Sequence, residues 1–148
     1  MNDDLDKKLT QKYPKIFKHR GSVNDTETLM GYGFAHGDGW YDILDALCAS
    51  IQQHISWKRK RPEYAGLTDE EFEEEHQTVA VQVKEKFGGL RFYVSGTDDY
   101  IRGAIDVAES MSLRTCEDCG APGRPRSGGW IRTLCDSCTA PNKRDKDA

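Results

Sequence analysis

The feature that most constrains this chain is a pair of CxxC sequences close to its C-terminal end. Four of its five cysteines lie there, at Cys116, Cys119, Cys135 and Cys138, and fifteen residues separate the two pairs. A CxxC turn lets two sulfurs converge on one ion, and an intervening loop of this length can fold back to complete a tetrahedral shell. We therefore expect the four thiolates to bind one structural Zn²⁺ ion.

Other cysteine chemistries fit the pattern less well. A thioredoxin-like redox site needs one CxxC at the start of a helix that follows a strand, whereas here two pairs flank a loop rich in Gly, Pro and Arg. An iron–sulfur cluster can also be bound by four cysteines, and it is the less favoured alternative to zinc. Catalytic zinc usually keeps an open coordination position, which four cysteines would close. The sequence therefore favours a structural metal.

Composition limits the class of protein. The chain has 148 residues with a formal net charge of -4 and a pI of about 5.6. This acidic balance argues against general nucleic-acid binding, because phosphate binding needs a basic surface. No apolar run approaches the roughly 18 residues of a membrane span, and residues 1–20 lack the pattern of a signal peptide. We expect a cytoplasmic protein, where disulfides are rare.

Two segments have the three- and four-residue apolar spacing of amphipathic helices. The first covers residues 39–58, with Asp38 expected as its cap and Cys48 on its apolar stripe. The second follows Thr97, which we expect to cap it. Its predicted buried stripe comprises Ile101, Ala104, Ile105, Ala108 and Met111.

Shorter elements are predicted elsewhere in the first half. Residues 3–17 suggest a short helix broken near Pro14, and residues 20–39 have the composition of a loop. Thr68 with Glu71 three residues on is a capping-box pattern, which predicts a short acidic helix.

Residues 79–94 predict a β-hairpin, because apolar and polar residues alternate on both sides of Gly88 and Gly89. A two-residue Gly-Gly turn would pair Phe87 with Leu90, Glu85 with Phe92 and Val83 with Val94. The predicted apolar face comprises Val79, Val81, Val83, Phe87, Leu90, Phe92 and Val94. Glu85 falls on this face, so it needs a polar partner or a position at the end of the sheet.

These elements define an α+β fold in which two main helices pack on a β-hairpin and a C-terminal four-cysteine zinc ribbon follows. We predict an α+β body over residues 1–112, a zinc ribbon over 113–140 and a flexible tail over 141–148.

Two surfaces are candidates for binding a macromolecule. The ribbon loop carries Arg124, Arg126, Trp130 and Arg132, a basic and aromatic set that can contact phosphates and bases. The polar face of the hairpin carries Lys84, Lys86, Arg91 and Tyr93. The simpler interpretation is that Trp130 packs over the metal site and that the charged residues are only solvated. Residues 112–148 hold seven Lys and Arg against five Asp and Glu, which leaves little net field.

Two patterns are candidates for a catalytic site. His36 and Asp38 lie in GFAHGDGW near a helix start, where acid–base groups often occur, but no nucleophile accompanies them. Gln82 and Lys84 have the (E/Q)xK form found in PD-(D/E)xK nucleases. No Pro-Asp strand precedes them, and Mg²⁺ prefers carboxylates to a neutral Gln. We therefore expect a protein that is not an enzyme, with a metal-dependent nuclease as a minor alternative.

Two resemblances accompany these observations. The string CEDCGAPG…TLCDSC resembles the four-cysteine finger of the DksA/TraR family, which binds RNA polymerase. That family has a long coiled-coil hairpin which this chain lacks, so the resemblance extends only to the four metal ligands. Over its whole length, through GDGWYDILDALC, QVKEKFGGLRFYV and CEDCGAPG, the chain is similar to uncharacterised small proteins of phages and prophages.

The resemblances imply a location in the cytoplasm of a bacterium or a phage-infected host. Together with the residues above, they lead us to expect a zinc-binding adaptor or inhibitor of a host macromolecule, with a protein complex as its partner. A host-takeover or anti-defence role would suit a phage protein. The alternative is a transcription regulator that binds nucleic acid or RNA polymerase. The sequence predicts no oligomeric state.

Overall fold

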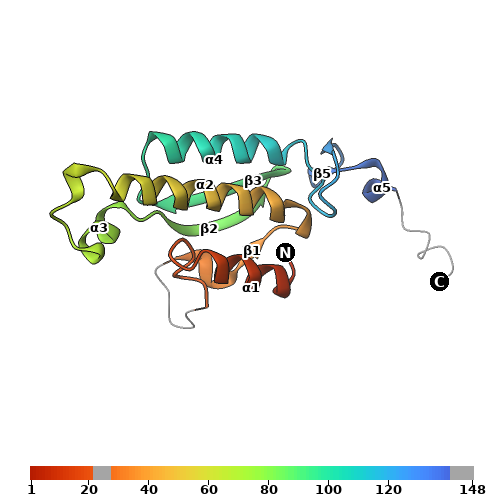
Figure 1. Cartoon of the computed structure of the whole chain (residues 1–148). Coiled ribbons are helices and arrows are strands. Elements are labelled where there is room, and N and C mark those ends of the chain that lie inside the picture. Colours follow the sequence, from red (N-terminus) through yellow and green to blue (C-terminus); the bar gives the residue numbers. More distant parts are fainter. Residues whose placement is uncertain (22–27, 141–148) are drawn as a thin grey trace.

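A computed structural model describes residues 1–21 and 28–140 of the chain (Figure 1). The expected α+β fold is confirmed, with α2 and α4 as its two main helices. The elements in order are α1 (Asp3–Lys12), η1 (Leu29–Tyr32), β1 (Phe34–Ala35), η2 (Asp38–Trp40), α2 (Tyr41–Arg59), η3 (Pro62–Tyr64), α3 (Asp69–His76), β2 (Val79–Lys86), β3 (Gly89–Ser95), α4 (Asp99–Ser112), β4 (Arg124–Arg126), β5 (Arg132–Leu134) and α5 (Asp136–Thr139). The predicted flexible tail, 141–148, lies outside the described residues.

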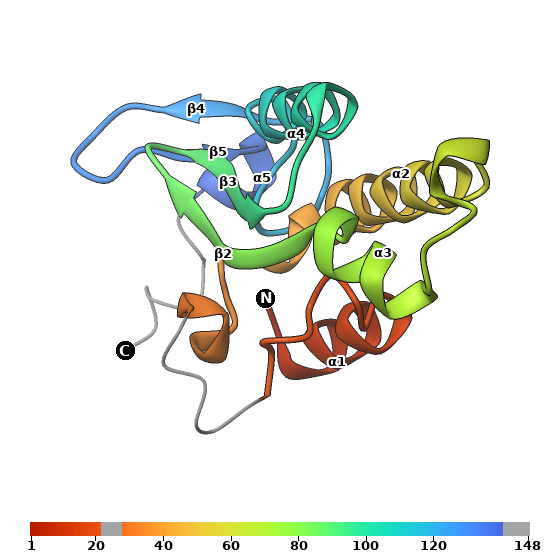
Figure 2. The same ribbon diagram turned by 90° about the vertical axis from the view of Figure 1, so that its left-hand side faces the viewer.

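The main sheet has three strands in the order β1-β2-β3, with β1 parallel to β2 and β3 antiparallel to it. Helices α1, α2 and α4 lie on the same side of this sheet (Figure 2). The other side, which we call the open side, carries no long helix of the described residues, although η1 contacts β2. The core forms between the helices and the covered face. Its fully buried side chains include Trp40, Leu44, Ile51, Val83 and Leu90. The short strand β1 falls in a segment where the sequence predicted only loop.

The hairpin forms where expected, but its turn is one residue earlier. Phe87 and Gly88 are the two turn residues, and both have positive φ, at 53° and 81°. The observed pairs are therefore Val83 with Phe92 and Glu85 with Leu90, which corrects the predicted register by two positions. A shift of two preserves which face each paired side chain occupies. Phe87 leaves the predicted apolar face because it lies in the turn.

A bulge at the start of the hairpin makes a second correction. The register shifts between Ala80 and Gln82, which leaves Val81 unpaired. The extra residue reverses the alternation, so Ala80 is buried in the core and Val81 is only half-buried. The polar exception, Glu85, has the partner that the sequence required: its carboxylate accepts a hydrogen bond from the Gly88 amide at 2.6 Å.

Helix boundaries agree with the predictions except at their caps. Helix α4 is capped by Asp98, not Thr97, through a 3.0 Å bond from the Ile101 amide. Asp38 lies within η2 and does not cap α2, because its carboxylate accepts hydrogen bonds from Asn2 at 2.6 and 2.8 Å. The predicted buried stripe of α4 is wrong at Met111, whose surface is 48% exposed.

The shorter helices follow local rules. The capping box of Thr68 and Glu71 is present at the start of α3. Helix α1 ends at Lys12, which agrees with the predicted break near Pro14, because the residue that precedes a proline is disfavoured in helical conformation. None of the helices in residues 1–21 and 28–140 is both long and apolar enough to cross a membrane.

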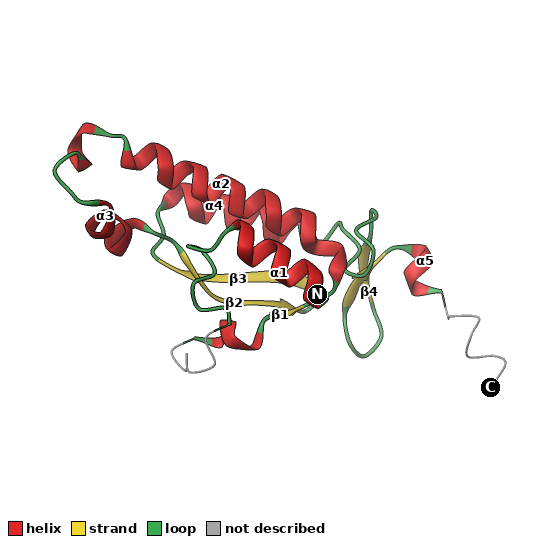
Figure 3. Cartoon of the chain, turned by 60° about the horizontal axis from the view of Figure 1, so that its bottom comes forward, coloured by secondary structure: helices red, strands yellow, loops and turns green. Residues whose placement is uncertain are grey.

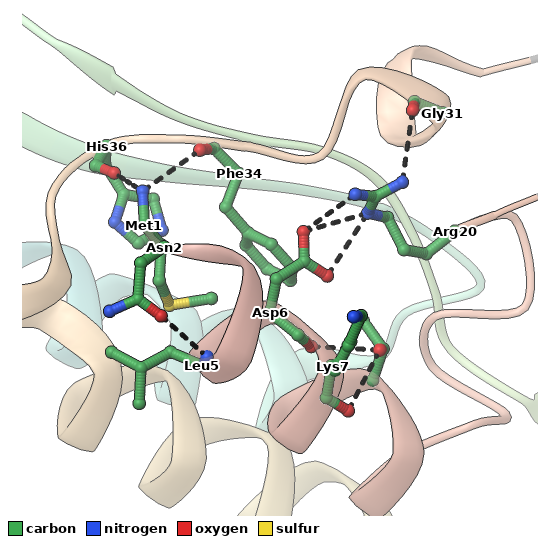
Figure 4. Close-up of polar contacts among 10 residues, drawn as sticks. Met1, Asn2, Leu5, Asp6, Lys7, Arg20, Gly31, Phe34 and His36 are labelled. Atoms are coloured by element: carbon green, nitrogen blue, oxygen red, sulfur yellow. Dashed lines mark hydrogen bonds and ion pairs between the residues drawn. The ribbon is translucent and has the colours of Figure 1, made fainter.

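The N-terminal segment is held against the strand β1 region by polar contacts (Figure 4). The Met1 amino group donates to the carbonyl oxygen of His36. Buried Asp6 accepts three hydrogen bonds from the guanidinium of Arg20, which also donates to the carbonyl of Gly31 at 3.3 Å. These contacts fix the loop that leads into η2, where the four-cysteine module attaches.

Candidate metal centre

The four predicted cysteines converge on one point. Their sulfur atoms all lie within 4.8 Å of one another, and the Cys119 and Cys135 sulfurs are 3.6 Å apart. A disulfide has an S–S distance of about 2.05 Å, whereas four sulfurs at about 2.3 Å from a central zinc ion would be about 3.8 Å apart. The arrangement therefore fits a tetrahedral metal ion and not a disulfide.

Local backbone geometry builds the first cysteine pair. The Gly120 amide donates to the Cys116 carbonyl at 2.9 Å, which closes a tight turn across the CxxC sequence. Gly120 has a φ of +79°, a conformation that favours glycine at this position. Strand pairing through the Cys116 amide, which donates to the Ala121 carbonyl at 2.7 Å, then turns the chain toward β4.

The second pair lies at the start of the short helix α5. Cys135 is the N-cap residue, and its sulfur accepts a hydrogen bond from the Cys138 amide at 3.4 Å. Arg126 holds this end in place, because its guanidinium donates to the Leu134 carbonyl and to Asp136 at 2.6 Å. The β4–β5 ribbon therefore brings the second pair back to the first.

Backbone amides favour negative charge at the centre. Burial raises the pKa of the Cys116 thiol, but N–H groups of Cys135, Cys119 and Asp118 outweigh it and lower the pKa to about 7. Hydrogen bonding to Cys135 and the other cysteines raises the pKa of Cys138. A metal ion binds thiolates rather than thiols, so a site that already stabilises one thiolate is suited to such an ion.

The module is bound to the body by close backbone contact. The Glu117 carbonyl accepts a hydrogen bond from the Gly39 amide at 2.7 Å, and its buried carboxylate accepts one from the Gly37 amide at 3.0 Å. A Cβ atom at Gly39 would lie 2.0 Å from the Cys116 carbonyl oxygen. Only glycine permits this approach between η2 and the first cysteine pair.

Two further contacts complete the attachment. The indole N–H of Trp40 donates to the Thr115 carbonyl at 2.9 Å. Thr133 of β5 donates its hydroxyl hydrogen to the Gly88 carbonyl at 2.6 Å, and its own carbonyl accepts from the Glu117 amide at 2.9 Å. Thr133 therefore joins the hairpin turn, the ribbon and the first cysteine pair.

The three arginines predicted to bind a macromolecule from the ribbon loop form ion pairs with acidic residues of the same module. Arg132 forms ion pairs with Glu117 and Asp118, next to the first two cysteines. Arg126 is held by Asp136, which also lies 3.8 Å from the more exposed Arg124. The expected packing of Trp130 over the metal site is wrong, because this side chain is 75% exposed and lies toward the hairpin turn.

The predicted hairpin residues do share one face. Lys84 pairs with Arg91 across the strands, and Tyr93 pairs with Gln82 in the same row, on the face opposite the buried Val83 and Phe92. Arg91 lies 3.7 Å from Glu109, while Lys86 and Tyr93 are exposed. The structure therefore groups these side chains on one face of the hairpin, and Lys86 also lines a cavity with Trp130 and Ile131 of the ribbon.

The candidate catalytic residues do not form a catalytic group with one another in the described part of the chain. His36, expected in a loop, is buried between Phe34 and Trp40, and its Nδ1–H donates to the Gly37 carbonyl at 2.7 Å. Gln82 and Lys84 face the open side of the sheet. In residues 1–21 and 28–140, the four cysteines are the one group of three or more side chains placed to hold a metal ion.

Sequence reasoning found the four cysteines but not the residues that position them. Glu117, Thr133 and the glycines of GFAHGDGW belong to the same assembly. The density of glycine in that motif was an available signal, since glycine marks close backbone approach, but the sequence does not show which segment approaches.

Comparison with known proteins gives no further assignment. No family model, no curated protein and no solved structure matches the chain. The resemblances to the DksA/TraR finger and to small phage proteins therefore remain predictions.

Proposed function

We propose that this protein is a zinc-stabilised module that binds another protein through the surface where the hairpin turn meets the ribbon loop. We call this surface the tip surface, and it comprises Glu85, Lys86, Phe87, Gly129, Trp130 and Ile131, which line a cavity of about 330 Å³. The hydroxyl of Thr133, which donates to the Gly88 carbonyl, joins the ribbon to the hairpin turn. Zinc is the metal we propose, because four thiolates in a closed tetrahedral shell are typical of structural zinc.

The observation that carries the proposal is the conformation of Phe87. Its φ of 53° is positive, and it is the single such non-glycine residue in the described chain. Its aromatic side chain is 71% exposed. A bulky residue in this conformation costs of order 1–3 kcal/mol. The strain places an aromatic ring in solvent beside Trp130, and exposed aromatic residues over a cavity are characteristic of binding hot spots.

Charge supports a protein partner over nucleic acid at this surface. Arg126 and Arg132 are already paired with neighbouring acids, and the charges that line the tip cavity are one acid and one base, Glu85 and Lys86. Phosphate binding would need unpaired cations. A partner with an apolar anchor fits this surface better.

The test is affinity capture from nuclease-treated bacterial lysate, the source suggested by the resemblance to phage proteins. The bait is the zinc-loaded chain, compared with a Phe87→Ser/Trp130→Ser variant and with Tyr93→Ala as matched control. We expect a stoichiometric protein that the control retains and the tip variant loses, and that rebinds when purified. If every captured protein also binds the tip variant, the proposal is wrong.

A nucleic-acid-binding regulator is the second candidate, and the grouping of Lys84, Arg91 and Tyr93 on the open sheet face favours it. Fluorescence anisotropy with a single-stranded oligonucleotide at low salt tests it. Salt-sensitive binding that a Lys84→Ala/Tyr93→Ala variant loses and the tip variant keeps would support this function. Absence of binding at low salt would remove it.

A further inference from the structure

A second apolar surface, formed by residues outside the metal centre and the tip surface, lies between α2 and α4. The two helices pack against each other, with His54 near the end of α2 stacked on Tyr100 at the start of α4. They are therefore antiparallel and lie side by side in one layer above the sheet (Figure 3). The groove between them has a volume of about 790 Å³.

The floor and walls of this groove differ in side-chain size. Small residues line it from both helices, namely Ala46 and Ser50 from α2 and Gly103 and Ala104 from α4. Larger apolar side chains flank them, including Tyr100, Val107 and Met111, which are 50%, 63% and 48% exposed. Close packing of helices needs small residues at the contact and larger ones beside it, so that ridges fit grooves.

Helix α4 therefore has two apolar stripes. Ile101, Ile105 and Ala108 face the core and are buried. Tyr100, Ala104, Val107 and Met111 form a second stripe with steps of three and four residues on the groove side. A helix that needs only one packed face usually carries polar residues elsewhere, so the second stripe is suited to a further helix.

The charges along the groove indicate the chemistry of that helix. The charged residues that line it are both acidic, Asp42 near one end and Asp99 near the other. Arg102 pairs with Asp99 at 3.1 Å, but both side chains are exposed, and an exposed pair of this kind contributes little and can be exchanged. A Lys or Arg at each end of an incoming helix would complement the two carboxylates.

We propose that the groove between α2 and α4 binds an amphipathic helix of a partner protein, with an apolar stripe flanked by basic residues. This inference goes beyond the proposed function, because it adds a second protein-binding surface independent of the tip surface. A second copy of this chain is a poorer occupant. In a two-fold contact the same patch meets itself, so acidic groove would face acidic groove on two chains of net charge -4.

The direct test uses a designed probe with the zinc-loaded full chain. The probe is a fluorescent amphipathic peptide of about 14 residues, long enough for four helical turns, with Leu on one face and Lys on the other. Its matched control replaces every Lys by Glu. We expect a Kd of about 10–100 μM for the Leu/Lys peptide and binding at least about tenfold weaker for the Leu/Glu peptide, with amide NMR shifts confined to α2 and α4.

Two variants of the chain probe the site itself. A Cβ atom at Gly103 meets nothing within 4 Å, so Gly103→Trp fills the groove without disturbing the core and should weaken Leu/Lys binding by about tenfold or more. Asp42→Asn/Asp99→Asn should weaken it by about threefold to tenfold. The Phe87→Ser/Trp130→Ser variant should bind the peptide unchanged, which separates this inference from the fate of the tip surface.

Four results would overturn the inference. They are no binding at about 1 mM peptide, equal binding of both peptides, NMR shifts outside the two helices, and full binding by Gly103→Trp. Light scattering adds a fifth: a concentration-dependent dimer that Gly103→Trp abolishes would mean that the groove holds a second copy of this chain.

Discussion

At the scale of single residues, glycine decides whether the metal-binding module can reach the body. Gly37 and Gly39 both lie where a side chain would enter the backbone of Glu117 or Cys116. Such contacts involve main-chain atoms, which cannot move aside as a flexible side chain can. The short motif between Phe34 and Trp40 is therefore a docking site for the first cysteine pair.

Gly39→Ala should destabilise the protein by at least about 3 kcal/mol, because overpacking against backbone exceeds the usual cost of an added methyl group. Denaturant unfolding of the zinc-loaded chain measures the change. Gly103→Ala is the matched control, since it adds the same methyl group in open space within a helix and should stabilise by about 0.5–1 kcal/mol. Equal effects of the two substitutions would contradict the docking role of Gly39.

His36 makes stability depend on pH. Burial lowers its pKa from 6.5 to about 4, although the Gly37 carbonyl opposes this shift. As the pH falls, His36 is therefore protonated near pH 6.5 in the unfolded chain but only near pH 4 in the folded chain. The stabilisation from neutral His36 is complete above pH 6.5 and is lost as the pH falls toward 4, by about 3 kcal/mol in all.

A His36→Gln variant isolates this effect, because the cysteine thiolates titrate in both proteins. We expect the stability advantage of the natural chain over the variant to shrink between pH 7 and pH 4. Urea unfolding at several pH values checks it. Parallel stability curves for the two proteins would show that His36 does not titrate differently in the folded state.

At the scale of elements, the turn of the β2–β3 hairpin is strained. A two-residue turn with positive φ at both positions favours Asn-Gly, yet this chain has Phe87 and Gly88 there. The turn is therefore not optimised for stability. Strain kept at an exposed aromatic residue is consistent with a role for that residue in binding.

Phe87→Asn should accordingly stabilise the protein by about 1 kcal/mol, because Asn tolerates positive φ and little burial is lost. The same variant should weaken binding of the partner captured through the tip surface. Thermal unfolding and a binding titration measure the two effects. A variant that is destabilised, or that is stabilised but binds as before, would contradict the role assigned to Phe87.

Helix α4 protects the outer edge of the hairpin. Strand β3 is an edge strand, and its Leu90 and Phe92 amides donate to the side chains of Ser112 and Glu109 at 2.8 and 3.0 Å. Unpaired edge amides would otherwise be available to another chain. The α4 side chains therefore take the place of a fourth strand.

Ser112→Ala should cost about 1–3 kcal/mol, because it leaves the buried Leu90 amide without a partner. Ser110→Ala, an exposed serine on the same helix, should change stability by less than about 0.5 kcal/mol. Chemical denaturation compares the two variants. Similar losses in both would mean that the hydroxyl of Ser112 has no special role at the edge.

The elements that the sequence predicts well are those fixed by local patterns. Helix α2, the capping box of α3, the hairpin and the cluster of four cysteines all follow from residues within about twenty positions of each other. The exact turn was missed because a Phe at positive φ is disfavoured, and local rules assigned the glycines instead. The bulge at Val81 was missed for a similar reason, because a strictly alternating sequence predicts a regular strand with no extra residue.

At the scale of the whole molecule, contacts between distant segments decide the arrangement. Gly37 and Glu117 are 80 residues apart in sequence, and Gly88 and Thr133 are 45 apart. No local pattern predicts such pairs. The sequence therefore predicts a ribbon after the body, but not which residues of the body the ribbon contacts. The structure shows that the four-cysteine module contacts η2 through Cys116 and the hairpin turn through Thr133.

Metal removal should therefore disturb the body as well as the ribbon. Without an ion, four cysteine side chains within 4.8 Å lose the bonds that hold them together, and structural zinc sites often contribute most of the folding free energy of their module. We expect about one zinc per chain by elemental analysis. After chelation, amide hydrogen exchange should accelerate by about tenfold or more over residues 113–138, 37–39 and 86–89.

The same experiment has an internal control. Amides in the buried half of α2, around Leu44 and Ile51, depend on the core between helices and sheet, so their exchange should change little. Cys135→Ser should reproduce the effect of chelation, whereas Cys48→Ser, in the core, should leave metal content unchanged. Faster exchange confined to the ribbon would mean that the module folds independently of η2 and the hairpin. Exchange throughout α2 would mean that the metal supports the entire fold, and the tip surface would then have no separate scaffold.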